Sequence, residues 1–277
     1  MTPKTIIITG ASDGIGASAA RQLATDGHRL LLVGRSAEKL APVATETGGQ
    51  AFTADFTRLD DVRRLASDLS DALAGEQLDV LANNAGGIYG NPQRTPDGFE
   101  KTLQVNHLAP FLLTNLLLPR LQHEGAAVVA TSSVGHRLFG KIDLDDLNNE
   151  KSPSANKTYG DAKLANALFT KSLHARYADT GLSTVAFHPG NVRTNFAADT
   201  TSFMRFVYQS PLKRLSLVPT EKGGATLAWF IAGTPGSTWQ SGEYYDERTL
   251  TTKVNPQVTD AALAEGLWQR SAEMVGL

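Results

Sequence analysis

Ile6-Ile7-Ile8-Thr9-Gly10-Ala11-Ser12-Asp13-Gly14-Ile15-Gly16 sets the architecture of this 277-residue chain. The stretch opens with a short, fully apolar, β-branched run, which is typical of a central parallel strand covered on both faces. A glycine-rich turn follows, and apolar residues at helical spacing continue to Asp26-Gly27. This order predicts a cradle for a dinucleotide pyrophosphate, because glycines let the backbone approach and a helix start favours negative charge. The alternative is an ordinary tight turn. The predicted cofactor-binding residues of the turn are Gly10, Ser12, Asp13, Gly14, Ile15 and Gly16.

The second predicted strand, residues 29–33, leads into Gly34-Arg35-Ser36. An NAD enzyme usually places a carboxylate here for the ribose hydroxyls, whereas an arginine is able to grip a 2′-phosphate. Arg35 therefore favours NADP(H) as the cofactor. Asp13 in the glycine loop would repel that phosphate, so NAD(H) stays open as an alternative. A solvated arginine at a helix start is the other interpretation of Arg35.

Two further strand ends supply candidate cofactor contacts. The run 51–56 predicts a third strand ending at Asp55, whose carboxylate is placed to accept a hydrogen bond from the adenine amino group, although a helix cap is an equally ordinary role for Asp. The run 78–82 predicts the next strand. The polar segment that follows it, Asn83-Asn84-Ala85-Gly86-Gly87, is placed to lie against a ribose of the cofactor. The cofactor-binding residues predicted in these segments are Asp55, Phe56, Asn83, Ala85 and Gly86.

Tyr159 and Lys163 are 163 − 159 = 4 residues apart in a segment rich in helix formers. This spacing puts their side chains on neighbouring turns of one helix face. A free phenol has a pKa of about 10, and a fixed cation nearby lowers it, so Tyr159 is predicted to act as a catalytic acid and base. A packed tyrosine beside a solvated lysine is the alternative.

Ser133 and Asn106 are the other candidate catalytic residues. Ser133 follows the predicted strand 126–131, and a strand's carboxyl end faces the crevice where α/β sheets bind ligands; a simple turn is the alternative. A long helix is predicted over 98–122, with Pro110 inside it and Asn106 one turn earlier. Proline frees a backbone carbonyl and bends the helix, so Asn106 can hold a water or the backbone there. The alternative is that Asn106 only satisfies the local helix geometry.

The strand predicted over 182–187 ends at His188 and the run Pro189-Gly190-Asn191-Val192-Arg193-Thr194. Thr194 is a candidate for the nicotinamide carboxamide, and His188 is taken as structural. The apolar segment 195–219 is predicted to be a lid over the substrate pocket. A helical pair packed on the body or a partner subunit is the alternative, and peripheral membrane contact is a further one. The cofactor contacts predicted in this part of the chain are Pro189, Gly190, Val192 and Thr194.

The composition narrows the function classes. A net charge of −2 without a basic stripe gives no reason to expect nucleic acid as a partner. The absence of cysteine excludes disulfides and thiolate zinc sites. We expect no metal, because a solvated loop explains the acidic run 143–149. The apolar runs are too short for a signal peptide or transmembrane anchor. One domain over 1–277 and a cytoplasmic location are therefore predicted.

In family order, these motifs resemble the short-chain dehydrogenase/reductase family over nearly the whole chain. They are Thr9-Gly10-x-x-x-Gly14-Ile15-Gly16, Asn83-Asn84-Ala85-Gly86, Asn106, Ser133, Tyr159-x-x-x-Lys163 and Pro189-Gly190-x-Val192-x-Thr194. Five further features are similar to its retinol-dehydrogenase-like and protochlorophyllide-reductase-like branch. They are residues 104–114, Ser133-Val134-Gly135-His136, the long spacer from Ser133 to Tyr159, Lys163-Leu164-Ala165-Asn166 and Gly242-Glu243-Tyr244-Tyr245.

The resemblance implies a doubly wound Rossmann fold with a single parallel sheet of about seven strands and helices on both faces. It also implies that Tyr159 donates or accepts the proton while Lys163 lowers its pKa and holds the nicotinamide ribose. Ser133 is expected to orient the carbonyl, and Asn106 to support a water relay to Lys163. A homodimer or homotetramer is expected from the same resemblance.

The leading functional hypothesis is an NADP(H)-dependent oxidoreductase that interconverts a small apolar ketone or aldehyde and its alcohol. Two alternatives stay open. One is reduction of a carbon–carbon double bond with the same site, and the other is a protein that senses NADP(H) without turnover.

Overall fold

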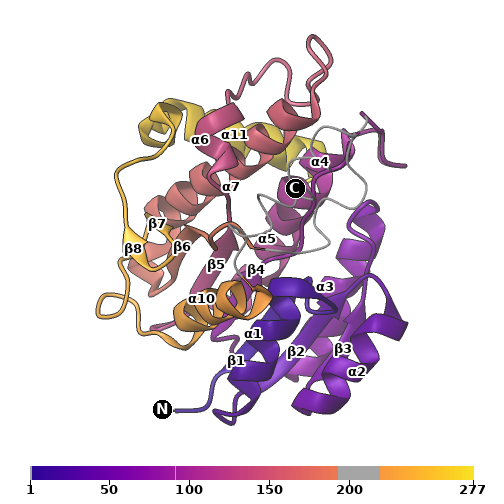
Figure 1. Cartoon of the computed structure of the whole chain (residues 1–277), viewed down its shortest axis with the longest axis vertical. Coiled ribbons are helices and arrows are strands. Elements are labelled where there is room, and N and C mark those ends of the chain that lie inside the picture. Colours follow the sequence, from indigo (N-terminus) through magenta and orange to yellow (C-terminus); the bar gives the residue numbers. More distant parts are fainter. Residues whose placement is uncertain (1, 91, 193–218) are drawn as a thin grey trace.

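Eight strands form one twisted sheet at the centre of the molecule (Figure 1). The computed structural model describes residues 2–90, 92–192 and 219–277. The strand order is β3-β2-β1-β4-β5-β6-β7-β8, and every neighbouring pair is parallel except β7 with β8. The strands are β1 (Thr5–Thr9), β2 (Arg29–Gly34), β3 (Gln50–Thr53), β4 (Val80–Asn83), β5 (Ala127–Thr131), β6 (Ser183–His188), β7 (Glu243–Asp246) and β8 (Thr249–Leu250).

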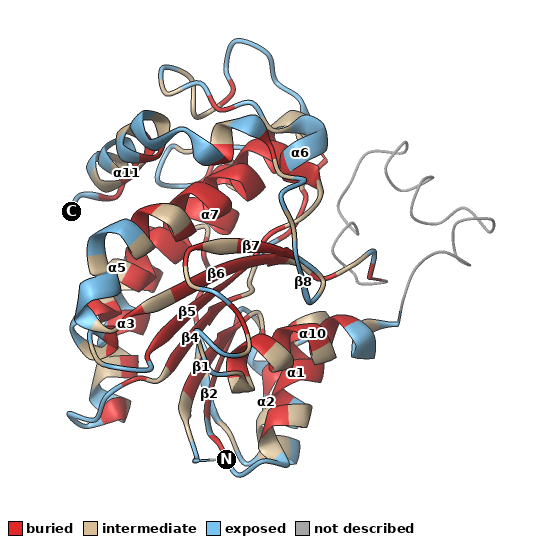
Figure 2. Ribbon diagram, turned by 90° about the vertical axis from the view of Figure 1, so that its left-hand side faces the viewer, coloured by how far each residue is buried: buried red, intermediate tan, exposed pale blue. Residues whose placement is uncertain are grey.

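Helices cover both faces of this sheet (Figure 2). One face is covered by α1 (Gly14–Ala24), α2 (Ala37–Thr47) and α10 (Thr220–Ala232). The other is covered by α3 (Leu59–Leu73), α5 (Ala109–Leu121) and α7 (Ala155–Tyr177), with α11 (Ala261–Val275) packed against α7.

The isoleucines of β1 explain why that strand is apolar throughout. Ile6 and Ile8 are buried against α1 and α10, whereas Ile7 is buried against α3 and α5 on the opposite face. Side chains alternate across a strand, so a central strand needs apolar residues at every position. The predicted doubly wound Rossmann fold is confirmed.

The final part of the sheet differs from the prediction in one respect. A single parallel sheet of about seven strands was expected, but β8 pairs antiparallel outside β7, with Tyr245 opposite Leu250. The sheet therefore has seven parallel strands and a two-residue antiparallel edge. The last helix is α11, and Asp260 caps it by accepting a hydrogen bond from the Leu263 N–H at 2.9 Å. Among the described residues, every helix is too short or too polar to cross a membrane.

The helix predicted over 98–122 is three shorter pieces, and its first residues are not helical. They are α4 (Lys101–Leu103), the π-helix η1 (Gln104–Leu108) and α5. In η1 the Ala109 N–H donates to the Gln104 carbonyl, five residues earlier. Pro110 has no N–H to donate to the Asn106 carbonyl, four residues earlier. The expected disturbance by the proline therefore takes the form of a π-helical turn that contains Asn106.

Candidate active site

A pocket of about 540 Å³ lies at the carboxyl ends of the parallel strands. Ligands bind at this edge in open α/β sheets. The pocket brings together sixteen of the predicted site residues, from the glycine loop at one end to the catalytic pair at the other. They are Gly10, Ser12, Asp13, Gly14, Ile15, Arg35, Asp55, Phe56, Ala85, Gly86, Ser133, Tyr159, Lys163, Pro189, Gly190 and Val192.

The glycine loop has the geometry of a backbone cradle. Gly10 has φ +68°, which favours glycine, and an added Cβ there would lie 2.9 Å from the Ala85 Cα. At Gly16 an added Cβ would lie 2.3 Å from the Gly10 carbonyl oxygen. Gly16 is not among the lining residues, so its role is the close packing of α1 against the loop. Together with the N–H groups at the start of α1, this loop fits a pyrophosphate.

Asp13 caps the amino end of α1. Its Oδ1 accepts a hydrogen bond from the Gly14 N–H at 2.7 Å, in an N-cap position with extended backbone. An acid there stabilises the helix start electrostatically. The carboxylate nevertheless lines the pocket, so the expected repulsion of a 2′-phosphate stays a prediction.

Two cations lie beside the glycine loop, where an added Cβ at Gly34 would be 3.0 Å from Ser12 Cβ, and the sequence indicated only one of them. Arg35 lines the pocket there, and so does Lys39, in the first turn of α2. Ser36 caps α2 by accepting a hydrogen bond from the Lys39 N–H at 3.3 Å. A lysine three residues after a helix-capping serine was the signal that could have revealed Lys39.

Asp55 lines the same pocket, and its carboxylate closes a turn by accepting a hydrogen bond. Its Oδ1 accepts a hydrogen bond from the Thr57 N–H at 2.9 Å. Arg58 occupies the N-cap position of α3, so Asp55 does not cap that helix. The alternative helix-cap role is therefore wrong, and the adenine contact stays a prediction.

Asn83 and Asn84 point in different directions. Asn83, the last residue of β4, is buried and donates from Nδ2 to Thr114 Oγ1 at 2.9 Å, away from the pocket. Asn84 lines the pocket, and its Nδ2 donates to the Thr9 carbonyl at 3.0 Å. Asn84 therefore faces the pocket in place of the predicted Asn83, because successive side chains alternate across a strand.

Tyr159 and Lys163 lie in the first half of α7, which begins after the N-cap Ser154. Tyr159 is 9% exposed and Lys163 only 2%. The Lys163 Nζ lies 5.8 Å from the centroid of the Tyr159 ring and donates to the Thr131 carbonyl at 3.0 Å. Burial lowers the pKa of Lys163 to about 7. The alternative of a solvated lysine is therefore wrong.

Ser133 and Tyr159 lie next to the same glycine, Gly135. The Gly135 N–H donates to Ser133 Oγ at 3.1 Å, which leaves the hydroxyl hydrogen available to another acceptor. An added Cβ at Gly135 would lie 3.0 Å from Tyr159 Cε1 and 3.4 Å from Ser133 Oγ. Both side chains therefore pack against Gly135, and both residues line the pocket.

Asn106 lies behind the pocket. Its Nδ2 donates to the Gly87 carbonyl at 2.8 Å, and its Oδ1 accepts from the Gly87 N–H at 3.2 Å. An added Cβ at Gly86 would lie 2.4 Å from Asn106 Oδ1 and 3.3 Å from Lys163 Nζ. The side chain therefore clamps the loop after β4 close to Lys163. The water relay assigned to Asn106 stays a prediction.

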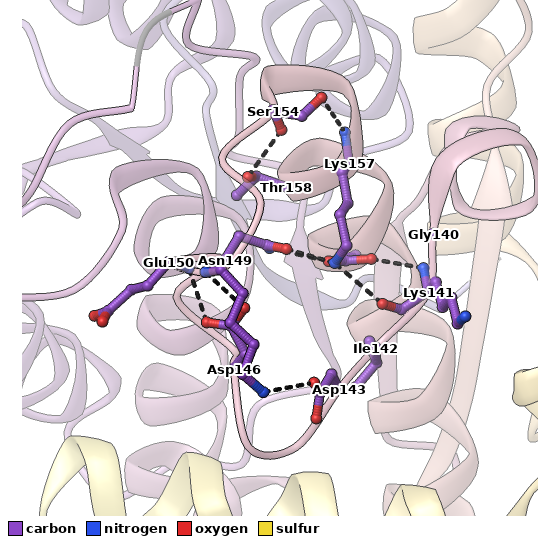
Figure 3. A network of polar contacts seen from close by, with 12 residues as sticks. Gly140, Lys141, Ile142, Asp143, Asp146, Asn149, Glu150, Ser154, Lys157 and Thr158 are labelled. Carbon is purple, nitrogen blue, oxygen red and sulfur yellow. Dashed lines mark hydrogen bonds and ion pairs between the residues drawn. The ribbon is translucent and has the colours of Figure 1, made fainter.

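The acidic run 143–149 belongs to a loop that folds against the start of α7 (Figure 3). Asp146 accepts hydrogen bonds from the N–H groups of Glu150 and Lys151, at 2.7 and 3.1 Å. Buried Asp161 accepts one from the Lys141 N–H at 2.6 Å. In the described part of the chain, no three His, Asp or Glu side chains are grouped to hold a metal. Thr194 and residues 195–218 of the expected lid lie outside the described residues.

Comparison with known proteins identifies the family of this chain. The short chain dehydrogenase family model matches residues 4–205. A Streptomyces sp. (strain C5) protein named "Putative daunorubicin C-13 ketoreductase DnrU" is 41% identical, over 99% of this chain and 93% of its own. Human retinol dehydrogenase 12 is 38% identical, over 99% and 87% of the two chains. The Pseudomonas aeruginosa RhlG/NADP active-site complex has a TM-score of 0.68 at 25% identity, covering 88% of this chain and 94% of its own.

The chain therefore belongs to the short-chain dehydrogenase family. Its relatives confirm the predicted retinol-dehydrogenase-like branch. Family, pocket and glycine loop together define an oxidoreductase with a nicotinamide dinucleotide cofactor.

Proposed function

We propose that this protein is an NADP(H)-dependent oxidoreductase that interconverts an apolar ketone or aldehyde and its alcohol. The proposal rests on one observation above all. Ser133, Tyr159 and the buried Lys163 line one pocket together with the glycine loop that fits a dinucleotide. A pure sensor would need the cradle but no proton donor.

When bound, the nicotinamide cofactor supplies or accepts the hydride. Tyr159 donates a proton to the carbonyl oxygen in reduction and takes one from the alcohol in oxidation. The Lys163 cation favours the phenolate and so brings the proton affinity of Tyr159 towards neutral pH. The Ser133 hydroxyl donates to the carbonyl oxygen and polarises it. Positioned proton transfer of this kind contributes roughly 10²–10⁴-fold to the rate.

The apolar nature of the substrate is inferred from the catalytic end of the pocket and from the relatives. Ile88, Val105 and Val134 line the pocket near the catalytic residues. The two relatives are named as a daunorubicin C-13 ketoreductase and a retinol dehydrogenase, that is, for a ketone and an alcohol as substrates. We propose the same broad class of substrate here.

The preference for NADP(H) is proposed from Arg35 and Lys39. A hydrogen bond to a charged group is worth about 1.5–3 kcal/mol, and two cations offset the repulsion from Asp13. Replacing Arg35 with Ala should weaken NADPH binding by roughly tenfold or more and leave NADH binding nearly unchanged, which fluorescence titration measures. Lys39→Ala should act in the same direction. Equal losses for both cofactors would remove the basis for this preference.

The decisive experiment is NADPH consumption by the purified protein with apolar ketones, aldehydes and enones, with product analysis. Tyr159→Phe should lower kcat by about 10²–10⁴-fold while leaving the NADPH Kd nearly unchanged. An alcohol product supports the proposal, whereas a saturated carbonyl product from an enone indicates carbon–carbon double-bond reduction. Tight NADPH binding without turnover of any compound would favour the sensor.

A further inference from the structure

The carbonyl group of Ser133 receives two hydrogen bonds from one residue. The backbone N–H of His136 donates to it at 3.0 Å, and the imidazole Nδ1 of His136 lies 2.6 Å from the same oxygen. A carbonyl oxygen only accepts, so Nδ1 carries the hydrogen in this bond. In the neutral ring, Nε2 is then unprotonated. Among the described residues, Nε2 has no hydrogen-bond partner.

The surroundings of His136 keep its ring in place and neutral. The side chain is 1% exposed, and its ring centroid lies 4.5 Å from that of Tyr244 on β7. Burial lowers the pKa of His136, and the nearby charges of Arg137 and His188 lower it further, while the bond to Ser133 opposes this shift. The His136 carbonyl accepts from Asn255 Nδ2 at 2.9 Å. Residue 136 is thus anchored through both its ring and its backbone.

We propose that His136 is a positioning residue for Ser133. The imidazole holds the Ser133 carbonyl, which fixes the peptide plane after Ser133 and so keeps the hydroxyl beside Tyr159. Without the imidazole, the Ser133 carbonyl keeps the backbone bond from residue 136 alone, and the turn that carries Oγ is free to rotate. The inference rests on the proposed function, because Ser133 has a role only if a carbonyl or alcohol binds there.

Two substitutions separate the hydrogen bond from simple packing. His136→Leu fills part of the same space without a donor, whereas His136→Asn places an amide N–H close to the position of Nδ1. His136→Leu should lower kcat by about 10- to 100-fold, since a misplacement of about 1 Å costs up to roughly 10² in rate. His136→Asn should recover most of the loss. The NADPH Kd should stay unchanged in both variants, because His136 does not line the pocket.

His123→Leu is the matched control. His123 Nε2 lies 3.0 Å from the Leu78 carbonyl, so this change removes the same kind of imidazole–carbonyl contact at the amino end of β4, far from the pocket. It should leave kcat unchanged. Wild-type kcat in His136→Leu, or equal losses in the Leu and Asn variants of His136, would overturn the proposal.

A measurement on the unmodified protein tests the hydrogen bond without turnover. The chain has six histidines, and the signals of His136 in a ¹⁵N–¹H imidazole NMR spectrum are those that disappear in His136→Asn. At pH 7 they should show the neutral Nδ1–H tautomer. The Nε2–H tautomer would overturn the inference. If the wild-type protein turned over no carbonyl compound or alcohol, the proposed function would fail and the positioning role with it, whereas the NMR result would still decide the hydrogen bond.

Discussion

Lys163→Met should stabilise the cofactor-free protein at pH 7 while abolishing turnover. Burial lowers the pKa of Lys163 from 10.5 to about 7, and each pKa unit corresponds to about 1.36 kcal/mol. The native state therefore loses up to about 5 kcal/mol at pH 7 by holding a buried ammonium. Methionine has a similar unbranched shape and no charge, but it forfeits the hydrogen bond to the Thr131 carbonyl, worth about 1 kcal/mol. A net gain of a few kcal/mol in the free energy of unfolding follows.

The sign of the pH dependence follows from the lowered pKa. The penalty is fully present below about pH 7, shrinks as the pH rises, and vanishes above the unfolded pKa of 10.5. The stability advantage of Lys163→Met over wild type should thus fall by roughly 2 kcal/mol between pH 7 and pH 9. Urea unfolding at the two pH values measures this difference.

The control for this experiment is Lys171→Met, in the same helix. Lys171 is partly exposed and pairs with Glu243 at 3.0 Å, so its removal should give little stabilisation and no comparable pH dependence. If Lys163→Met were less stable than wild type at pH 7 and the difference did not change with pH, Lys163 would not be a buried, depressed cation and the reasoning would fail.

Two further predictions concern packing around the site. Gly86→Ala should lower Tm and weaken NADPH binding, because its Cβ would lie 2.4 Å from Asn106 Oδ1. Gly87→Ala is the control, since the nearest atom to its Cβ would be 3.4 Å away. An equal loss of Tm in the two variants would contradict this prediction. Asp161→Asn should lower the free energy of unfolding by about 1–3 kcal/mol in urea titrations, since its buried carboxylate accepts three hydrogen bonds. The exposed Asp143→Asn is the control, and equal effects of the two changes would argue against a special role for the buried carboxylate.

The architecture was predictable because the decisive patterns are local. Three consecutive isoleucines in β1 feed two cores on opposite faces, so the run itself indicates a central strand. Likewise, a spacing of four residues on one helix sufficed to bring Tyr159 and Lys163 together in the pocket.

What the sequence did not reveal depends on neighbours that are distant in the chain. Asn83 and Asn84 are chemically alike, and only the packing of β4 against α5 decides which of them faces the pocket. The π-helical turn depends on Pro110 together with the Asn106 clamp on Gly87. The burial of Lys163 requires the carboxyl end of β5 at Thr131, which is 32 residues away in the chain.

The site is divided between two elements that must be held in register. Ser133 follows β5, whereas Tyr159 is carried by α7, and the helix α6 (Gly135–Phe139) starts between them in the chain. The end of α6 packs backbone to backbone on α7: an added Cβ at Gly160 would lie 2.6 Å from the Gly140 nitrogen.

Asp161 joins the same two parts by a second route. It accepts hydrogen bonds from the Lys141 N–H at 2.6 Å and from Lys157 Nζ at 2.5 Å, and Lys157 in turn donates to the Lys141 carbonyl at 3.2 Å. The residue after Gly140 is thus bound to the catalytic helix through both its N–H and its carbonyl group. In the proposed mechanism Tyr159 and Ser133 contact one substrate oxygen atom, so a shift of α6 along α7 would separate them without disturbing the cofactor cradle. Changes at this contact should therefore reduce kcat before they affect NADPH binding.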